Sequence, residues 1–200
     1  MIELPTDLPA DLAPLSWLRG VWEGTGVIDY PVGDALLRGE FSHRVSFSHD
    51  GGPFLNYAAT ASFLGAEGDQ TPVPLVAETG FWRLSRPRSD GDPGPALLPP
   101  TAPAPERTVD DVEALRTDDG FPIEVSMAHS DGTLELYLGR VAGPRIDIAT
   151  DALVRPAGAA AYSAASRMYG LVDGHLLWAW DIAALGTPLR AHASARLAKV

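Results

Sequence analysis

Short alternating runs of apolar and polar residues, separated by turn residues, constrain the fold of this chain more than any other feature. In one such run the alternate positions are Phe41, His43, Val45, Phe47 and His49. Three serines and an arginine stand between them. A period of two residues is typical of β-strands. Because no segment keeps an apolar period of 3.6 residues for long, the pattern predicts an all-β fold.

About ten strands are predicted in this way. Turn residues such as Ser130-Asp131-Gly132 separate several of them. Consecutive strands joined by mostly tight turns favour an antiparallel meander, and closure of that meander into a barrel pairs its exposed edges. A two-sheet sandwich is the alternative. The predicted strands cover residues 22–30, 41–49, 54–57, 73–84, 123–128, 133–140, 145–150, 164–172, 175–182 and 189–198.

The segment 86–120 interrupts this rhythm and contains seven prolines. We interpret it as a loop inserted into one domain that spans residues 1–200, since strand-like patterning resumes directly after it. Within the insertion, residues 109–115 predict a short turn of helix. Another short helix is expected over 9–19, where leucines spaced three residues apart lie on one side and can plug an end of the barrel.

The composition excludes several classes of chemistry. The chain contains no cysteine, so disulfides, thiolate nucleophiles and cysteine-ligated metals are ruled out, and any metal must be held by histidine or carboxylate. Fifteen basic against 26 acidic residues give a net charge of −11, which repels nucleic acid and anionic lipid. No apolar run is long enough to span a membrane, and residues 1–7 do not resemble a secretion signal. We therefore expect a cytoplasmic protein without nucleic-acid or membrane partners.

The most specific local motif is a GxWxGxG sequence formed by Gly20, Trp22, Gly24 and Gly26. Trp22 shares a strand face with the last two glycines, so its ring can lie beside backbone that carries no side chains, which suits tight closure of a barrel. A phosphate-binding loop is the alternative. It is disfavoured because no helix follows the glycines and their spacing fits neither nucleotide-binding motif.

An ordered set of further motifs follows GxWxGxG, namely Tyr30-Pro31, Val45-Ser46-Phe47-Ser48-His49, Pro53-Phe54-Leu55-Asn56-Tyr57, Ala77-Glu78-Thr79-Gly80-Phe81-Trp82-Arg83, Ile123-Glu124-Val125 and Pro188-Leu189-Arg190-Ala191-His192. With this set, the chain resembles the nitrobindin family. GxW alone also occurs in lipocalin-like barrels, but the set spans nearly the whole chain outside the proline-rich insertion. The resemblance implies a ten-stranded, fatty-acid-binding-protein-like barrel that binds ferric haem b through one histidine, binds nitric oxide and isomerises peroxynitrite to nitrate.

The resemblance implies that His192 is the axial ligand of the haem iron and the catalytic residue. A single neutral imidazole binds haem iron well and leaves the opposite face of the iron open. Periodicity alone favours a surface position, because His192 alternates in phase with Arg190 and out of phase with its apolar neighbours. Val32 occupies a cofactor-binding position where family members commonly have a threonine. Leu75 and Val76 replace a methionine and a histidine, which predicts a more apolar pocket.

The other polar residues are assigned structural roles. His43 and His49 are roughly 20 Å apart along an extended strand and cannot share a metal ion. His49 precedes a turn and is expected to make structural hydrogen bonds, whereas His129 and His175 are expected to be solvated. Glu78 is expected to form a salt bridge inside the barrel with an arginine. The aromatic residues assigned to the barrel core are Trp22, Phe47, Tyr57, Phe81, Trp82, Trp178 and Trp180.

Two other function classes stay open from the sequence. The barrel could bind a fatty acid or another lipophilic molecule without haem, as a non-enzymatic binding protein. The proline-rich stretch 93–105 could instead bind a protein partner, although a tolerated loop is the simpler interpretation. Formation of a homodimer is also left open.

Overall fold

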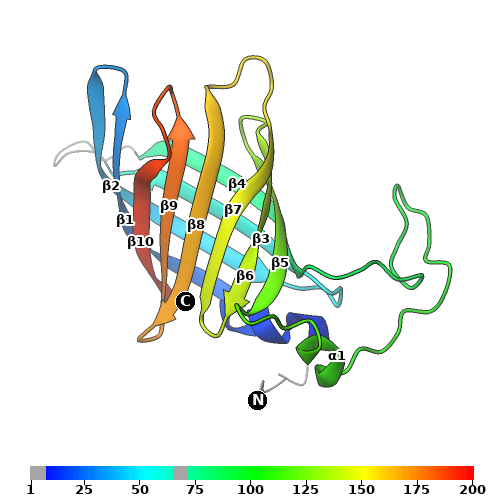
Figure 1. Ribbon diagram of the computed structural model, residues 1–200. Helices are drawn as coiled ribbons and strands as arrows, with labels where there is room; N and C mark the ends of the chain where they lie inside the picture. Colours follow the sequence, from blue (N-terminus) through cyan, green and yellow to red (C-terminus); the bar gives the residue numbers. More distant parts are fainter. Residues whose placement is uncertain (1–7, 65–71) are drawn as a thin grey trace.

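The computed structural model describes residues 8–64 and 72–200, and these residues form a closed antiparallel β-barrel (Figure 1). The predicted all-β barrel is therefore confirmed, and the sandwich is excluded. The absence of a secretion signal was predicted from residues 1–7, which lie outside the described residues. The strands are β1 (Gly20–Val32), β2 (Ala35–Ser48), β3 (Leu55–Phe63), β4 (Val73–Leu84), β5 (Phe121–His129), β6 (Leu134–Ala142), β7 (Arg145–Val154), β8 (Tyr162–Val172), β9 (His175–Ala184) and β10 (Arg190–Lys199).

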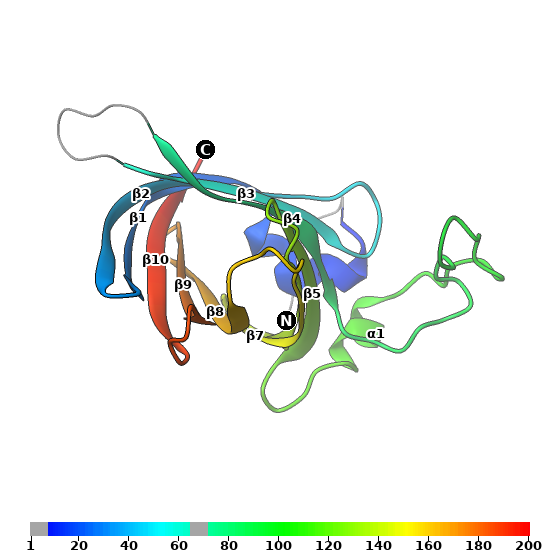
Figure 2. The same ribbon diagram turned by 90° about the horizontal axis from the view of Figure 1, so that it is seen from above.

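Each strand pairs with the next along the chain, and β10 returns to pair with β1 (Figure 2). The closing register places Trp22 opposite Lys199 and Ile28 opposite Ala193. β2 begins six residues before its predicted start. Residues 35–40 were missed because Leu36 and Leu37 are adjacent and a glycine takes the next inward position, so the sequence shows no apolar alternation. In the structure, half-buried Leu37 and Gly39 do alternate with exposed neighbours.

The GxWxGxG motif lies where β1 meets β10. A Cβ atom on Gly24 would lie 2.3 Å from the Arg196 carbonyl oxygen, and one on Gly26 would lie 2.4 Å from the Ser194 carbonyl oxygen. Only glycine therefore allows β10 to approach β1 this closely. The Trp22 ring is buried, and its Nε1 donates a hydrogen bond to the Leu18 carbonyl oxygen at 2.7 Å. This geometry gives the motif a role in closing the barrel.

One end of the barrel is closed by η1 (Ala10–Leu18), a 3-10 helix (Figure 1). This helix confirms the one expected over 9–19. The side chains that it inserts into the core are fully buried, and they belong to Leu12, Leu15 and Leu18. A second short helix, α1 (Val109–Glu113), packs against η1 and buries Val112 completely. Thr108 and Asp111 form a capping box at its start.

The proline-rich insertion is attached to the closed end at two points. Arg86, at its beginning, lies 3.7 Å from Asp11 of η1, and Arg107 lies 3.0 Å from the same carboxylate. Asp92 pairs with Arg86 at 2.6 Å. Between these anchors the chain projects away from the barrel (Figures 1 and 2). The loop is thus tethered through its ends, and the helix predicted over 109–115 is confirmed as α1.

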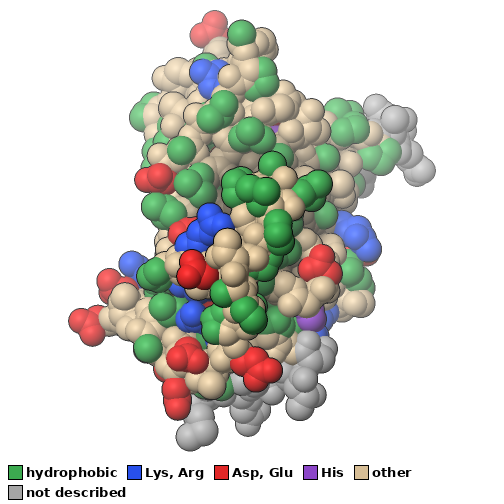
Figure 3. All heavy atoms as spheres, turned by 90° about the vertical axis from the view of Figure 1, so that its right-hand side faces the viewer, with side chains coloured by type: hydrophobic (Ala, Val, Ile, Leu, Met, Phe, Trp, Pro, Cys, Tyr) green, Lys and Arg blue, Asp and Glu red, His purple; other side chains and the backbone are tan. Residues whose placement is uncertain are grey.

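Most of the aromatic residues predicted to lie in the core do so, but the prediction for Phe81 is wrong. Phe81 is 51% exposed and contacts Phe54 on the outer surface, with ring centroids 5.2 Å apart. Its neighbour Trp82 takes the inward position on β4. Apolar side chains are also exposed on the side of the barrel from which the insertion projects (Figure 3). No helix among the described residues is long and apolar enough to cross a membrane.

Candidate functional site

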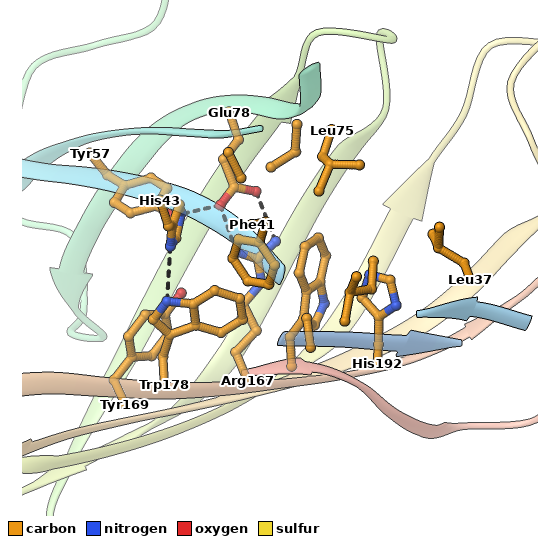
Figure 4. Close-up of a pocket in the computed structure, with 15 residues that line it drawn as sticks. Leu37, Phe41, His43, Tyr57, Leu75, Glu78, Arg167, Tyr169, Trp178 and His192 are labelled. Atoms are coloured by element: carbon orange, nitrogen blue, oxygen red, sulfur yellow. Dashed lines mark hydrogen bonds and ion pairs between the residues drawn. The ribbon is translucent and has the colours of Figure 1, made fainter. Parts of the chain in front are cut away.

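A mostly apolar cavity lies inside the barrel (Figure 4). Its lining includes Leu37, next to the β1–β2 hairpin, and this hairpin lies at the end of the barrel opposite η1 (Figure 1). The cavity holds about 270 Å³. This volume is slightly below the roughly 300–1,000 Å³ that is typical of ligand and cofactor pockets. The lining residues are Ile28, Leu37, Phe41, His43, Tyr57, Ala61, Leu75, Val76, Glu78, Arg167, Tyr169, Trp178, Trp180, His192 and Ala193.

His192 enters this cavity because β10 contains a bulge. Ala191 pairs with Asp181 and Ala193 pairs with Trp180, so His192 is an extra residue with no partner of its own on β9. A bulge changes the direction in which the extra side chain points. Both His192 and Ala193 consequently line the cavity. The surface position favoured by periodicity is wrong, since strict alternation assumes an unbroken register.

The imidazole of His192 is enclosed by aromatic rings and lacks a hydrogen bond on one nitrogen. Its ring centroid lies 5.1 Å from that of Tyr30 and 5.5 Å from that of Trp180, and both rings are nearly perpendicular to it. The Nδ1 atom is buried and has no hydrogen-bond partner among the described residues. Burial, aided by the positive charge of Arg167, lowers the pKa of His192 to about 4. The ring is therefore neutral at pH 7, with a lone pair free to bind a metal.

A buried ion-pair network forms one wall of the cavity. Arg167 donates from Nη1 and Nη2 to the two carboxylate oxygens of Glu78, at 2.8 and 2.9 Å, and lies 3.5 Å from Glu135. The predicted salt bridge of Glu78 with an arginine is confirmed. Burial alone would raise the pKa of Glu78, but the charge and hydrogen bonds of Arg167 outweigh it and lower the value to about 2.

His129 belongs to the same network, so its predicted solvation is wrong. Its Nε2 lies 2.6 Å from Glu135, its Nδ1 lies 3.6 Å from Glu78, and its side chain is only 10% exposed. The β5–β6 hairpin folds His129 back onto Glu135, a contact that spacing along the chain does not reveal. His175 is half-buried and contacts Arg196 near the turn before β9.

Two members of this network, Arg167 and Glu135, were not predicted from the sequence. Arg167 lies between Ala165 and Tyr169 in the alternation of β8, and all three are buried. Its position on the same strand face as Ala165 and Tyr169 was the one sequence signal that could have identified Arg167 as buried. Glu135 gave no such signal, because the leucines beside it suggest the opposite orientation of β6. Three tyrosines complete the network by donating hydrogen bonds to the carboxylates, namely Tyr57 to Glu78 and Tyr137 and Tyr162 to Glu135.

A second histidine lines the cavity away from His192 (Figure 4). The Nε1 of Trp178 donates to Nδ1 of His43 at 3.0 Å, which fixes that nitrogen as an acceptor. Burial lowers the pKa of His43 to about 4. His49 accepts a hydrogen bond from the Gly51 backbone at 3.3 Å, in keeping with its expected structural role.

The remaining pocket predictions concern the mouth of the barrel. Leu75 and Val76 line the cavity and extend its apolar wall, as their sequence suggested. Val32 is at the end of β1, is 43% exposed, and does not belong to the described lining. Its role in cofactor binding stays a prediction.

Comparison with known proteins places this geometry in a family. Residues 11–199 match the model of the THAP4-like, heme-binding beta-barrel domain. The chain belongs to this family. The resemblance to nitrobindins is thereby confirmed, and haem is the cofactor of the family. The residues present fit haem, because the cavity is mostly apolar and His192 lines it with a neutral imidazole, which keeps one unprotonated nitrogen that can bind iron.

Individual relatives agree with the family assignment. A peroxynitrite isomerase of Clavibacter michiganensis subsp. michiganensis (strain NCPPB 382) is 61% identical over the full length of both chains. One of Leifsonia xyli subsp. xyli (strain CTCB07) is 62% identical and covers 100% of this chain and 99% of its own. The crystal structure of Rv2717c from M. tuberculosis superposes with a TM-score of 0.67 at 26% identity, covering 97% of this chain and 99% of that chain.

Proposed function

We propose that this protein binds ferric haem b in the cavity with His192 as the axial ligand, binds nitric oxide and isomerises peroxynitrite to nitrate. The observation that carries the proposal is the bulge at His192, which points its neutral imidazole toward the inside of the apolar cavity. Relatives about 60% identical that are named peroxynitrite isomerase support the reaction.

When bound, haem supplies a ferric iron that acts as a Lewis acid toward the peroxynitrite anion. His192 provides its lone pair on one side of the site and remains available at pH 7 because its pKa is depressed. The apolar wall, which includes Phe41, Leu75 and Val76, excludes water during the rearrangement to nitrate. The isomerisation of the anion moves no net proton, so the site needs no separate general base.

Titration of the purified protein with hemin tests this assignment. We expect the wild type to give a sharp Soret band and His192→Ala to bind hemin at least about 10-fold more weakly, because ligand removal abolishes the iron bond. Imidazole added to the variant should restore the band. Equal titrations of the two proteins would overturn the assignment of His192. Failure of both to bind hemin, with uptake of a fluorescent fatty acid, would favour the haem-free binding protein.

Several finer statements belong to the same proposal. We place the activity in the cytoplasm, treat residues 1–200 as one domain with 86–120 as its insertion, and assign Val32 to the rim of the haem site. Formation of a homodimer is a further prediction that sedimentation can check. The net charge of −11 supports the expectation that nucleic acid is not a partner.

A further inference from the structure

His192 is held in an unusual way for a residue proposed to bind iron. Histidine ligands are generally oriented by a hydrogen bond from their second ring nitrogen to a carboxylate, a carbonyl or water. Here Nδ1 is buried without a hydrogen-bond partner among the described residues. The bulge also leaves His192 without a residue opposite it on β9. Among the described residues, ring packing rather than a hydrogen bond therefore holds the imidazole.

Two aromatic rings contact the imidazole, and both are themselves immobilised. The hydroxyl of Tyr30 donates to the Ala184 carbonyl oxygen at 3.1 Å and accepts from the Ala184 amide at 3.0 Å. This double contact ties the ring of Tyr30, from β1, to β9. Trp180 lies on β9 opposite Ala193, directly beside the bulge. Its ring stands at 84° to the imidazole of His192.

Trp180 is held by charged groups of the buried network. The guanidinium carbon of Arg167 lies 3.9 Å from the centroid of the Trp180 ring, which is a cation–π contact. His129 stacks on the same indole at 6.3 Å with an interplanar angle of 26°. Because Arg167 is bound in turn by both oxygens of Glu78, the indole packs against a fixed charge rather than a flexible side chain.

We propose that Trp180 is a positioning residue, whose ring, anchored by Arg167, fixes the His192 imidazole in place of the absent hydrogen bond. This inference rests on the proposed role of His192 as the iron ligand. The indole Nε1 has no acceptor among the described residues, so the ring contact and not the N–H group carries the effect. A phenyl ring at position 180 should therefore serve nearly as well.

The apo protein provides a test that does not depend on haem. The order parameters of the imidazole rings are measured by NMR relaxation in the wild type and in Trp180→Leu and Trp178→Leu. Trp178 is the matched control, because it lines the same cavity from the same strand but contacts His43. We expect Trp180→Leu to mobilise only the ring of His192 and Trp178→Leu to mobilise only that of His43.

The hemin-loaded protein provides the second measurement. We expect Trp180→Leu to weaken hemin binding roughly 10- to 100-fold, as second-sphere changes at metal sites do, and Trp180→Phe to stay within about threefold of the wild type. The spread of the haem methyl hyperfine shifts in the cyanide adduct, which depends on the orientation of the axial imidazole, should change in the leucine variant and be preserved in the phenylalanine variant.

Two outcomes would overturn the inference. In the first, Trp180→Leu keeps the wild-type order of His192 and the wild-type hemin affinity. In the second, Trp180→Phe behaves like Trp180→Leu, which would assign the effect to the indole N–H. A wild-type hemin titration of His192→Ala is a different failure: it removes the iron ligand assigned above, while the NMR result on the apo protein still decides whether Trp180 orients the ring.

Discussion

The two ends of the barrel differ in how completely side chains fill the interior. At the closed end, the leucines of η1 are fully buried and Trp22 has both close packing and a hydrogen bond. At the open end, a cavity remains and two neutral histidines line it. Unfilled space costs folding free energy. The closed end therefore stabilises the barrel, and that stability lets the open end stay available for a ligand.

The largest effect that separates the two ends is expected from Trp22→Ala. Loss of this buried ring should reduce the free energy of unfolding by about 3–5 kcal/mol, because a cavity opens beneath the closed end. Below its lowered melting temperature, the variant should still bind hemin. Leu36→Ala, in the exposed β1–β2 hairpin, is the control and should change stability by less than about 0.5 kcal/mol. Urea unfolding and hemin titration check both expectations.

A pH-dependent effect sharpens the comparison at the open end. The pKa of His43 is about 4 when folded and 6.5 in a model peptide, so the unfolded chain binds a proton in this interval and the folded one does not. The stability that wild type has above pH 6.5 should therefore fall by up to about 3 kcal/mol toward pH 4. His43→Gln removes this contribution and keeps an acceptor for Trp178. A stability difference between the two proteins that stays constant with pH would contradict the expectation.

The insertion tests whether the closed end extends beyond the barrel itself. Val112→Ala removes buried apolar surface between α1 and η1, so we expect a loss of about 1–2 kcal/mol in chemical unfolding. Cleavage of the insertion by a protease should become faster at the same time. Leu97→Ala, at a fully exposed position of the same insertion, should have no effect on either measurement. Equal effects of the two variants would show that α1 contributes nothing to the closed end.

The smallest effect is expected at Asp11. Burial raises the pKa of this carboxyl, although Arg107 and Arg86 oppose the shift. Its ionised form is therefore disfavoured in the folded protein, and the relief of that cost in Asp11→Asn offsets the loss of the ion pairs with Arg86 and Arg107. We expect the free energy of unfolding to change by less than about 1 kcal/mol at pH 7. The difference in stability between Asp11→Asn and the wild type should become smaller as the pH falls, because the Asp11 carboxyl of the folded wild type then gains a proton. If Asp11→Asn instead lost more than about 1 kcal/mol of stability, the ion pairs with Arg86 and Arg107 would contribute more than the burial of the carboxylate costs.

The architecture could be predicted from the sequence because it depends on local patterns. Alternation identified most strands, turn residues separated them, and leucines spaced along 9–19 identified η1. The leading part of β2 was missed because its half-buried face holds a glycine beside Leu37, while the adjacent Leu36 is exposed, so apolar residues do not alternate in the sequence. Phe81 was assigned to the wrong face because an aromatic residue suggests a core, although its neighbour Trp82 occupies that face.

The site was less predictable because its residues meet across the barrel. Arg167 and Glu78 are 89 positions apart, and no local pattern joins them. β6 is the clearest case: Glu135 and Tyr137 point inward, whereas Leu134 and Leu138 are exposed. A buried charge network reverses the usual relation between polarity and burial on that strand. His192 was assigned to the cavity only by family resemblance, since a one-residue bulge cannot be seen in alternation.

That bulge divides β10 into two parts with independent tasks. Beyond Ala193, the strand follows β1 in unbroken register from Ile28 to Trp22 and seals the wall. Before Ala193, the one additional residue exchanges the inward-facing and outward-facing positions of the strand. Deleting a single amino acid there would send the imidazole outward and leave the seam intact. The direction of the proposed iron ligand thus depends on one extra residue in a single strand.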